Sequence, residues 1–117
     1  MRVTCGTDII EISRIKKAID SLQSFKTRIF TKNEIEYCES KNASKYEHYA
    51  ARFAAKEAIY KALNKELSWT DVEIINNEKG KPEIRFLNNT NLDYESIDIS
   101  LSHCKEYATA NVAVIYK

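Results

Sequence analysis

The chain has 117 residues, 44% of them apolar and 30% charged, with only two glycines and one proline. This length fits one domain over residues 1–117 with a single core, and the composition excludes an intrinsically disordered chain. The net charge is only +1, and no apolar run approaches the ~20 residues that span a bilayer, so we expect no membrane contact. The N-terminal segment lacks the apolar stretch of a secretory signal and no cysteines form a CxxC pair, which together indicate a cytoplasmic protein with reduced thiols.

The first third of the chain predicts one strand followed by two helices. Residues 3–10 are largely apolar, which predicts a strand, and Gly6 within it marks a bulge or a close approach. Isoleucines at helical spacing predict an amphipathic helix over about 13–22. A capping-box pattern of Thr31 and Glu34 then begins a second helix that ends near Ser40.

The segment from Arg14 to Lys32 is strongly basic. It holds six basic residues and one acidic residue, Asp20. Such a cluster predicts an acidic partner, either a nucleic acid or an acidic protein, although it is equally typical of a solvated helix face. The interleaved aromatics of an RNA-binding sheet are missing and the isoelectric point is about 7.7, so we expect no nucleic-acid binding.

Residues 46–64 form the longest helical pattern and are apolar nearly all round, which predicts a central helix covered on more than one side. Glu57 falls among the apolar positions of this helix, with Lys61 one turn further along. A carboxylate on such a face needs a partner, which is either Lys61 or a metal ion. Arg52 and Lys56 lie on another side of the helix, where the default for long cations is to reach solvent.

The rest of the chain predicts antiparallel strands. Alternating apolar residues over 72–76 and 84–86 flank a turn at residues 77–80, and a second alternating pair over 97–101 and 108–114 flanks a turn near Cys104. A strand, then helices, then meandering strands indicate an α+β fold with a largely antiparallel sheet packed around the long helix.

Asp8, at the end of the first strand, is a second unusual carboxylate. It is either a neighbour of the next helix N-terminus or, if it converges with Glu57, one of two oxygen ligands that suit Mg²⁺. Lys61 would then contact a phosphate, whereas the ordinary alternative is a helix-surface pair between Glu57 and Lys61. Two carboxylates would also suit another Mg²⁺ enzyme that acts on phosphodiesters.

Six segments in this order resemble the holo-acyl-carrier-protein synthase family of 4′-phosphopantetheinyl transferases, in its short homotrimeric form. The resemblance covers nearly the whole chain and rests on the following segments: Gly6-Thr7-Asp8-Ile9-Ile10, Arg28-Ile29-Phe30-Thr31, Arg52-Phe53-Ala54-Ala55-Lys56-Glu57-Ala58, Trp69 with Asp71, Gly80-Lys81-Pro82 and Ser100-Leu101-Ser102-His103.

The resemblance implies a fold, an activity and a set of site residues. The activity is transfer of phosphopantetheine from coenzyme A to a serine of apo acyl carrier protein, in fatty acid biosynthesis. Asp8 and Glu57 would hold Mg²⁺ and Lys61 would neutralise the pyrophosphate, so these three are the expected catalytic residues. Glu57, directly or through a water that it orients, is the candidate base. The remaining expected contacts to coenzyme A come from Arg52, Lys81, Pro82 and His103.

The resemblance also implies binding partners, and the chain departs from the family pattern at two places. The acidic carrier protein would dock on Arg14, Lys17 and Arg28, and active sites would lie at the subunit junctions of a homotrimer. The family's Gly-x-Gly turn after the central helix is replaced by residues 64–66, with Asn64 able to adopt a left-handed conformation. Residues 88–96 are rich in asparagine, so a helix expected there is predicted to be short or absent.

Overall fold

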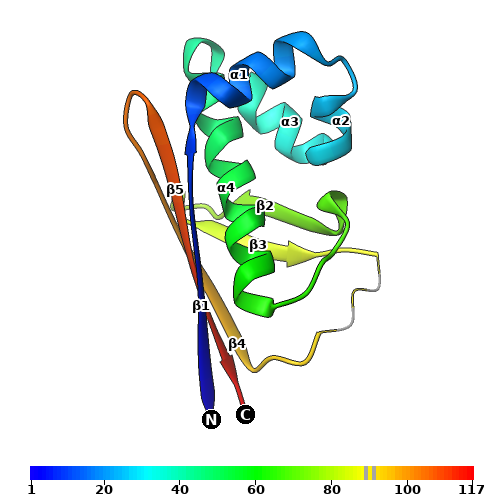
Figure 1. The fold of residues 1–117 in the computed structure, drawn as a ribbon, viewed down its shortest axis with the longest axis vertical. Helices are drawn as coiled ribbons and strands as arrows, with labels where there is room; N and C mark the ends of the chain where they lie inside the picture. The colour runs from blue at the N-terminus through cyan, green and yellow to red at the C-terminus, as the bar shows by residue number, and fades with distance from the viewer. Residues whose placement is uncertain (89, 91) are drawn as a thin grey trace.

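The computed structural model describes residues 1–88, 90 and 92–117. The elements in chain order are β1 (Arg2–Glu11), α1 (Ile12–Ser21), α2 (Phe25–Ile29), α3 (Lys32–Glu39), η1 (Asn42–Ser44), α4 (Lys45–Leu63), η2 (Trp69–Asp71), β2 (Val72–Asn76), β3 (Pro82–Phe86), β4 (Ser96–His103) and β5 (Tyr107–Tyr116) (Figure 1). The predicted α+β class is confirmed, and each predicted helix and strand is present.

The strands form two antiparallel sheets instead of the one sheet that the pattern suggested. The larger sheet has the order β1-β5-β4, and β2 and β3 form a separate hairpin. The long pairing of β1 with β5 runs from Arg2 opposite Tyr116 to Glu11 opposite Tyr107, so the two chain termini lie together at one end (Figure 1). The β2–β3 turn closes at Gly80, whose φ of 84° suits glycine.

Helix α4 packs along the inner face of the larger sheet, as the apolar pattern predicted. Ala54, Ala55, Ala58 and Ile59 are fully buried there against Val112 and Val114 of β5. Gly6 of β1 is the point of closest approach: a Cβ built on it would lie 1.9 Å from the carbonyl oxygen of Ala58. The pairing of β1 has no bulge at this position, so the glycine serves the close approach.

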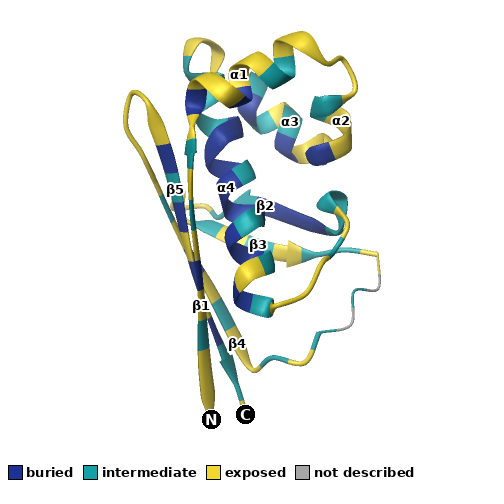
Figure 2. Cartoon of the chain, viewed as in Figure 1, coloured by how far each residue is buried: buried dark blue, intermediate teal, exposed yellow. Residues whose placement is uncertain are grey.

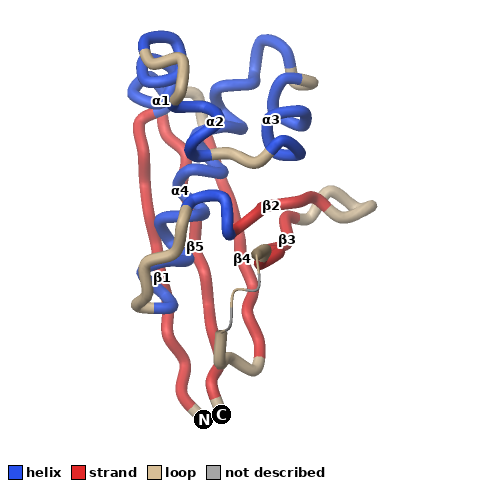
Figure 3. The backbone as a smooth tube through the Cα atoms, turned by 90° about the vertical axis from the view of Figure 1, so that its right-hand side faces the viewer, coloured by secondary structure: helices blue, strands red, loops and turns tan. Residues whose placement is uncertain are grey.

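Helices α1, α2 and α3 gather around the N-terminal end of α4, at one end of the long strands (Figure 3). A second core cluster forms there, with Phe30 and Tyr49 buried in ring contact at 4.9 Å between centroids. The Thr31–Glu34 capping box is present at the start of α3. Helix α2 was not predicted, because its five residues are too few to produce a helical period.

The two departures from the family pattern behave as the residue types suggested. Asn64 ends α4 in the left-handed conformation with φ of 50°. The described residues between β3 and β4 contain no helix, while Asn89 and Asn91 of that stretch lie outside the described residues.

Candidate active site

Asp8 and Lys61 are joined directly between β1 and α4. Lys61 Nζ lies 3.2 Å from Asp8 Oδ1 and also donates to the Thr7 carbonyl oxygen at 2.9 Å. The close packing at Gly6 brings this part of β1 onto the helix, and Asp8 is on the same face of the strand as Gly6. Fold and sequence together therefore place a strand carboxylate beside a helix cation, although 53 positions separate them.

Glu57 is half-buried and lies close enough to Asp8 to sense its charge. Burial raises the pKa of Glu57, the Asp8 carboxylate raises this pKa further, and Lys61 lowers it. Within the described part of the chain, Glu57 forms no ion pair, since Lys61 turns to Asp8 instead. The alternative prediction, an ion pair between Glu57 and Lys61 on the helix surface, is therefore wrong.

Asp8 and Glu57 remain a pair of carboxylates without a third protein ligand. Among the described residues, no group of three or more histidine, cysteine or acidic side chains is arranged to hold a metal. Two carboxylates whose charges disfavour each other are nevertheless a suitable donor set for a cation that keeps water and phosphate ligands. The residues present thus fit Mg²⁺, and the metal assignment stays a prediction.

Lys56 corrects the expectation that the cations of α4 reach solvent. It is fully buried, and its Nζ donates to Glu34 Oε1 at 2.7 Å and to the carbonyl oxygens of Ile29 and Trp69, both at 2.8 Å. Glu34 in turn accepts from the backbone N–H of Ile74 at 2.8 Å. Lys56 does not reach solvent, because three acceptors lie within hydrogen-bond distance of its ammonium group inside the core. The resulting network connects α3, α4 and β2.

Arg52 is buried as well, with 2% of its surface exposed. Its guanidinium carbon lies 4.1 Å from the centroid of the Tyr37 ring, and its Nη2 donates to Asn76 Oδ1. Its Nε is buried with no hydrogen-bond partner, and within the described residues it forms no ion pair with a carboxylate. Arg52 is therefore a buried cation without a counter-ion, unlike Lys56.

His103 ends β4 on the same side of the molecule as the first turn of α4. Its Nδ1 lies 3.4 Å from Glu47 Oε2, and its ring centroid lies 5.7 Å from that of His48. Further along β4, Lys81 Nζ contacts Asp98 Oδ1 at 2.8 Å, and the neighbouring Pro82 begins β3. These expected nucleotide contacts thus span the β3 and β4 region and the N-terminal half of α4.

Within a single chain, these expected nucleotide contacts are separate from the carboxylates Asp8 and Glu57. Among the described residues, no hydrogen bond or ion pair connects Asp8, Glu57 or Lys61 to Arg52, Lys81 or His103. Arg52 and Glu57 are five positions apart on one helix, which turns their side chains about 140° away from each other. The predicted site residues therefore form two groups.

The basic segment lies on the surface. Arg14 and Lys17 of α1 and Arg28 of α2 are exposed, and both helices lie at the helical end of the molecule (Figure 2). Lys16 pairs with Asp20 on α1 at 3.4 Å, and Lys26 pairs with Glu39 at 3.2 Å, whereas Arg14, Lys17 and Arg28 form no ion pair with a described residue. These three charges are thus available to an acidic surface.

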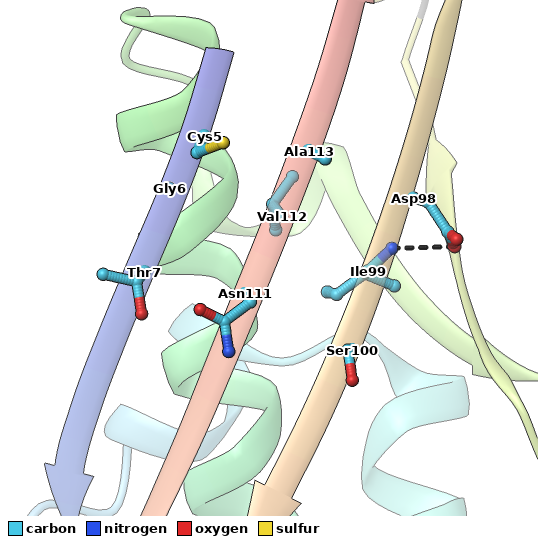
Figure 4. A pocket seen from close by; sticks show the side chains of 9 residues that line it. All are labelled: Cys5, Gly6, Thr7, Asp98, Ile99, Ser100, Asn111, Val112 and Ala113. Carbon is cyan, nitrogen blue, oxygen red and sulfur yellow. Dashed lines mark hydrogen bonds between the residues drawn. The ribbon is translucent and has the colours of Figure 1, made fainter. Parts of the chain in front are cut away.

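The outer face of the larger sheet, opposite α4, is not covered by any described element. It is concave, and its hollow of about 460 Å³ is lined by short side chains, among them Cys5, Thr7 and Asn111 (Figure 4). Val3 and Ile9 on the same face of β1 are 58% and 63% exposed. An uncovered sheet face that carries exposed apolar side chains is typical of a protein contact surface.

The chain matches known proteins over almost its full length. A family model described as the 4′-phosphopantetheinyl transferase superfamily matches residues 4–112. The holo-[acyl-carrier-protein] synthase of Ruminiclostridium cellulolyticum is 45% identical, with 97% of this chain and 92% of that protein covered. The crystal structure of a holo-(acyl-carrier-protein) synthase from Bacillus anthracis in complex with CoA (3′,5′-ADP) is 36% identical and superposes with a TM-score of 0.82, covering 97% and 96% of the two chains.

A second similar crystal structure also contains coenzyme A. The Helicobacter pylori holo-[acyl-carrier-protein] synthase in complex with coenzyme A is 33% identical and superposes with a TM-score of 0.80, covering 94% of this chain and 98% of that chain. No helix in the described part of the chain is long and apolar enough to cross a membrane. The match of family, relatives and fold has one conclusion: the chain belongs to the 4′-phosphopantetheinyl transferase superfamily and, within it, to the holo-[acyl-carrier-protein] synthases.

Proposed function

We propose that this chain, acting as one domain, transfers the 4′-phosphopantetheine group of coenzyme A to a serine of apo acyl carrier protein. The products are holo acyl carrier protein and adenosine 3′,5′-bisphosphate. The observation that carries the proposal is the junction of β1 and α4, where two carboxylates, Asp8 and Glu57, meet the ammonium group of Lys61. This is the charge pattern that a pyrophosphate group and a divalent cation require.

The reaction exchanges one phosphorus–oxygen bond for another. The serine oxygen of the carrier attacks the phosphorus that bears the pantetheine arm, and the bond to the nucleotide phosphate breaks. The serine proton passes to Glu57, directly or through a water that its carboxylate orients. No activated nucleophile is needed on this chain, because the carrier brings it.

Asp8 and Glu57 are the residues that would hold Mg²⁺. When bound, the ion supplies neutralisation of the pyrophosphate charge. Lys61 is 55% exposed and long enough to turn from Asp8 to a phosphate oxygen, which it would do if Asp8 and Glu57 held the ion. Lys61 thus acts as a point charge on the group that leaves.

The carrier docks on the exposed cations Arg14, Lys17 and Arg28. Acyl carrier protein is acidic, and complementary charge steers such a partner to the surface and fixes its orientation. These residues lie at the helical end of the molecule, on α1 and α2. We place the enzyme in the cytoplasm, where it serves fatty acid biosynthesis.

A homotrimer accounts for the separation of the site residues into two groups. The uncovered face of the larger sheet, with Val3 and Ile9 exposed on it, is the surface for contact between copies. Contact between copies lets the carboxylates of one subunit face Arg52, Lys81 and His103 of another. Sedimentation tests this directly: we expect a trimer, and Ile9→Glu should give monomers with little transfer activity. A stable, active monomer would contradict shared sites.

The transfer itself is tested by mass spectrometry. The protein is mixed with coenzyme A, Mg²⁺ and an apo acyl carrier protein, and the carrier is weighed before and after. We expect a gain of one phosphopantetheine group and none when Mg²⁺ is chelated. A folded protein that adds no mass to any of several carriers would rule the proposal out.

A further inference from the structure

A row of three rings connects β4, α4 and α3 beside the buried guanidinium. The ring centroids of His103 and His48 are 5.7 Å apart, and those of His48 and Tyr37 are 5.5 Å apart. Tyr37 also contacts two cations, Arg52 at 4.1 Å and Lys41 at 4.7 Å from its centroid. Arg52 and His103 were expected near the nucleotide from the family pattern, whereas nothing in that pattern assigned a role to His48.

Two cations of this cluster, Arg52 and Lys41, form no ion pair with a described residue. Arg52 is buried, has an Nε without a hydrogen-bond partner and forms no ion pair with a described residue. A buried charge without a counter-ion is costly, and the cost falls when an anion binds next to it. The cluster's one carboxylate, Glu47, lies 3.4 Å from His103 and is itself partly exposed.

His48 is held in a state that an anion would change. Burial lowers its pKa, and the positive charges of Arg52, His103 and Lys41 lower this pKa further, while Glu47 raises it. The imidazole is therefore neutral in the free protein at neutral pH. A phosphate dianion beside it would accept a hydrogen bond from the ring and favour the protonated form.

We propose that His48 is a specificity-determining residue that, together with Arg52 and His103, binds the 3′-phosphate of the coenzyme A nucleotide. This inference rests on the proposed function. His48 precedes Arg52 by about one turn of α4, and its ring contacts His103 directly and Tyr37, on which Arg52 stacks. The proposal makes the preference for coenzyme A over its 3′-dephospho form depend on this ring.

The test compares two substrates that differ only in that phosphate. His48→Phe keeps a ring against Tyr37 and His103 and removes the ring nitrogens. With the full chain, we expect kcat/KM for coenzyme A to fall on the order of tenfold, as for a lost hydrogen bond to a charged group. The value for 3′-dephospho-coenzyme A should stay within about twofold. An equal fall for both substrates, or no change in their ratio, would overturn the assignment.

A binding measurement separates this inference from the transfer reaction. Calorimetry with adenosine 3′,5′-bisphosphate and with adenosine 5′-monophosphate needs no catalysis. We expect His48→Phe to weaken the bisphosphate by the same factor and to leave the monophosphate unchanged. If the wild type transfers nothing, the proposed function fails, and the two nucleotides still decide the role of His48.

Two further variants guard against a folding defect. Lys41→Gln removes a cation from the same cluster and should lower the preference for the 3′-phosphate, by a smaller factor because Lys41 is exposed. Lys105→Gln removes the same charge from the nearby β4–β5 turn, outside the cluster, and should leave the preference unchanged. If His48→Phe does not fold, a Lys41→Gln preference equal to that of Lys105→Gln contradicts the proposal.

Discussion

Helix α4 carries two sets of charged side chains that the fold treats differently. Lys56 is fully buried and has three acceptors within 2.8 Å, one of them the carboxylate of Glu34. Arg52 and Glu57, on either side of it in the sequence, lack an ion-pair partner within the described residues. Burial alone therefore does not distinguish a functional charge on this helix from a structural one. For these three residues the pairing does, since Lys56 has a carboxylate partner inside the core, whereas Arg52 and Glu57 have no partner of opposite charge among the described residues.

The largest expected effect is the loss of transfer activity when Glu57 or Asp8 is substituted. Glu57→Gln and Asp8→Asn keep the size of each side chain and remove its charge, so kcat/KM for transfer should fall by about 10²–10³-fold or more. Thermal melting should change little, because neither carboxylate supports the core. Glu95→Gln removes a charge from an exposed position near β4 and should leave transfer unchanged. A variant of Glu57 or Asp8 that works at the wild-type rate would contradict the metal assignment.

Lys56 and Arg52 should differ in how much they stabilise the fold. Removing one partner of a buried pair leaves the other uncompensated, so Lys56→Met should lower the free energy of unfolding by about 3–5 kcal/mol. Arg52→Met loses one hydrogen bond and a ring contact, and should cost only about 1 kcal/mol while transfer falls. Denaturant melts and kcat/KM of the two variants are the measurements. Similar losses of stability in both would show that Arg52 is a structural residue too.

A third test asks whether the unpaired surface cations act on the carrier alone. Arg14→Glu reverses a charge on the expected docking surface, so KM for the carrier should rise by about tenfold while KM for coenzyme A stays within about twofold. Lys117→Glu makes the same reversal at the C-terminus and serves as the matched control. Equal losses for both substrates would argue against a dedicated docking surface.

The smallest expected effect is on the pH dependence of stability and comes from Glu39, a surface carboxylate with several partners. The Glu39 carboxylate accepts a hydrogen bond from Tyr49 at 2.6 Å and pairs with Lys26 and Lys45. The hydrogen bond from Tyr49 is the largest cause that lowers the pKa of Glu39 from 4.5 to about 2, and the two cations lower it further. A lowered pKa means that the stabilisation is present above about pH 4.5 and is lost as the pH falls toward 2.

Glu39→Gln should therefore flatten the acid side of the stability profile. The loss at neutral pH should stay below about 1 kcal/mol, because Glu39 is more than a third exposed and solvent screens its pairs. Chemical denaturation of the wild type and the variant between pH 2 and pH 7 measures both effects. Parallel profiles would mean that the network contributes nothing to acid stability.

The sequence predicted most of the fold because most of the fold is periodic. The α4 pattern, the capping box of Thr31 and the two strand pairs follow from the local order of residues. The five-residue α2 and the division into two sheets do not, since a short helix has no period and pairing depends on contacts distant in sequence.

The site was predictable only in part for the same reason. The residue types of Asp8, Glu57 and Lys61 signal chemistry, but the choice of Asp8 as the partner of Lys61 depends on how β1 lies on α4. The burial of Lys56 depends on Glu34, which is 22 positions away. The position of His48 in a row of rings likewise depends on β4, and a lone histidine in a helix gave no signal of it.

The alternation of β1 has a consequence for how this chain tolerates changes in length. Gly6 and Asp8 face the helix, while Cys5 and Thr7 face the open side of the sheet (Figure 4). A single inserted or deleted residue in this strand would exchange the two sets at once, placing side chains against Ala58 and the carboxylate on the outer face. The register of β1 therefore does not tolerate a change of one residue, and we expect changes of length to be tolerated only in the connections between elements.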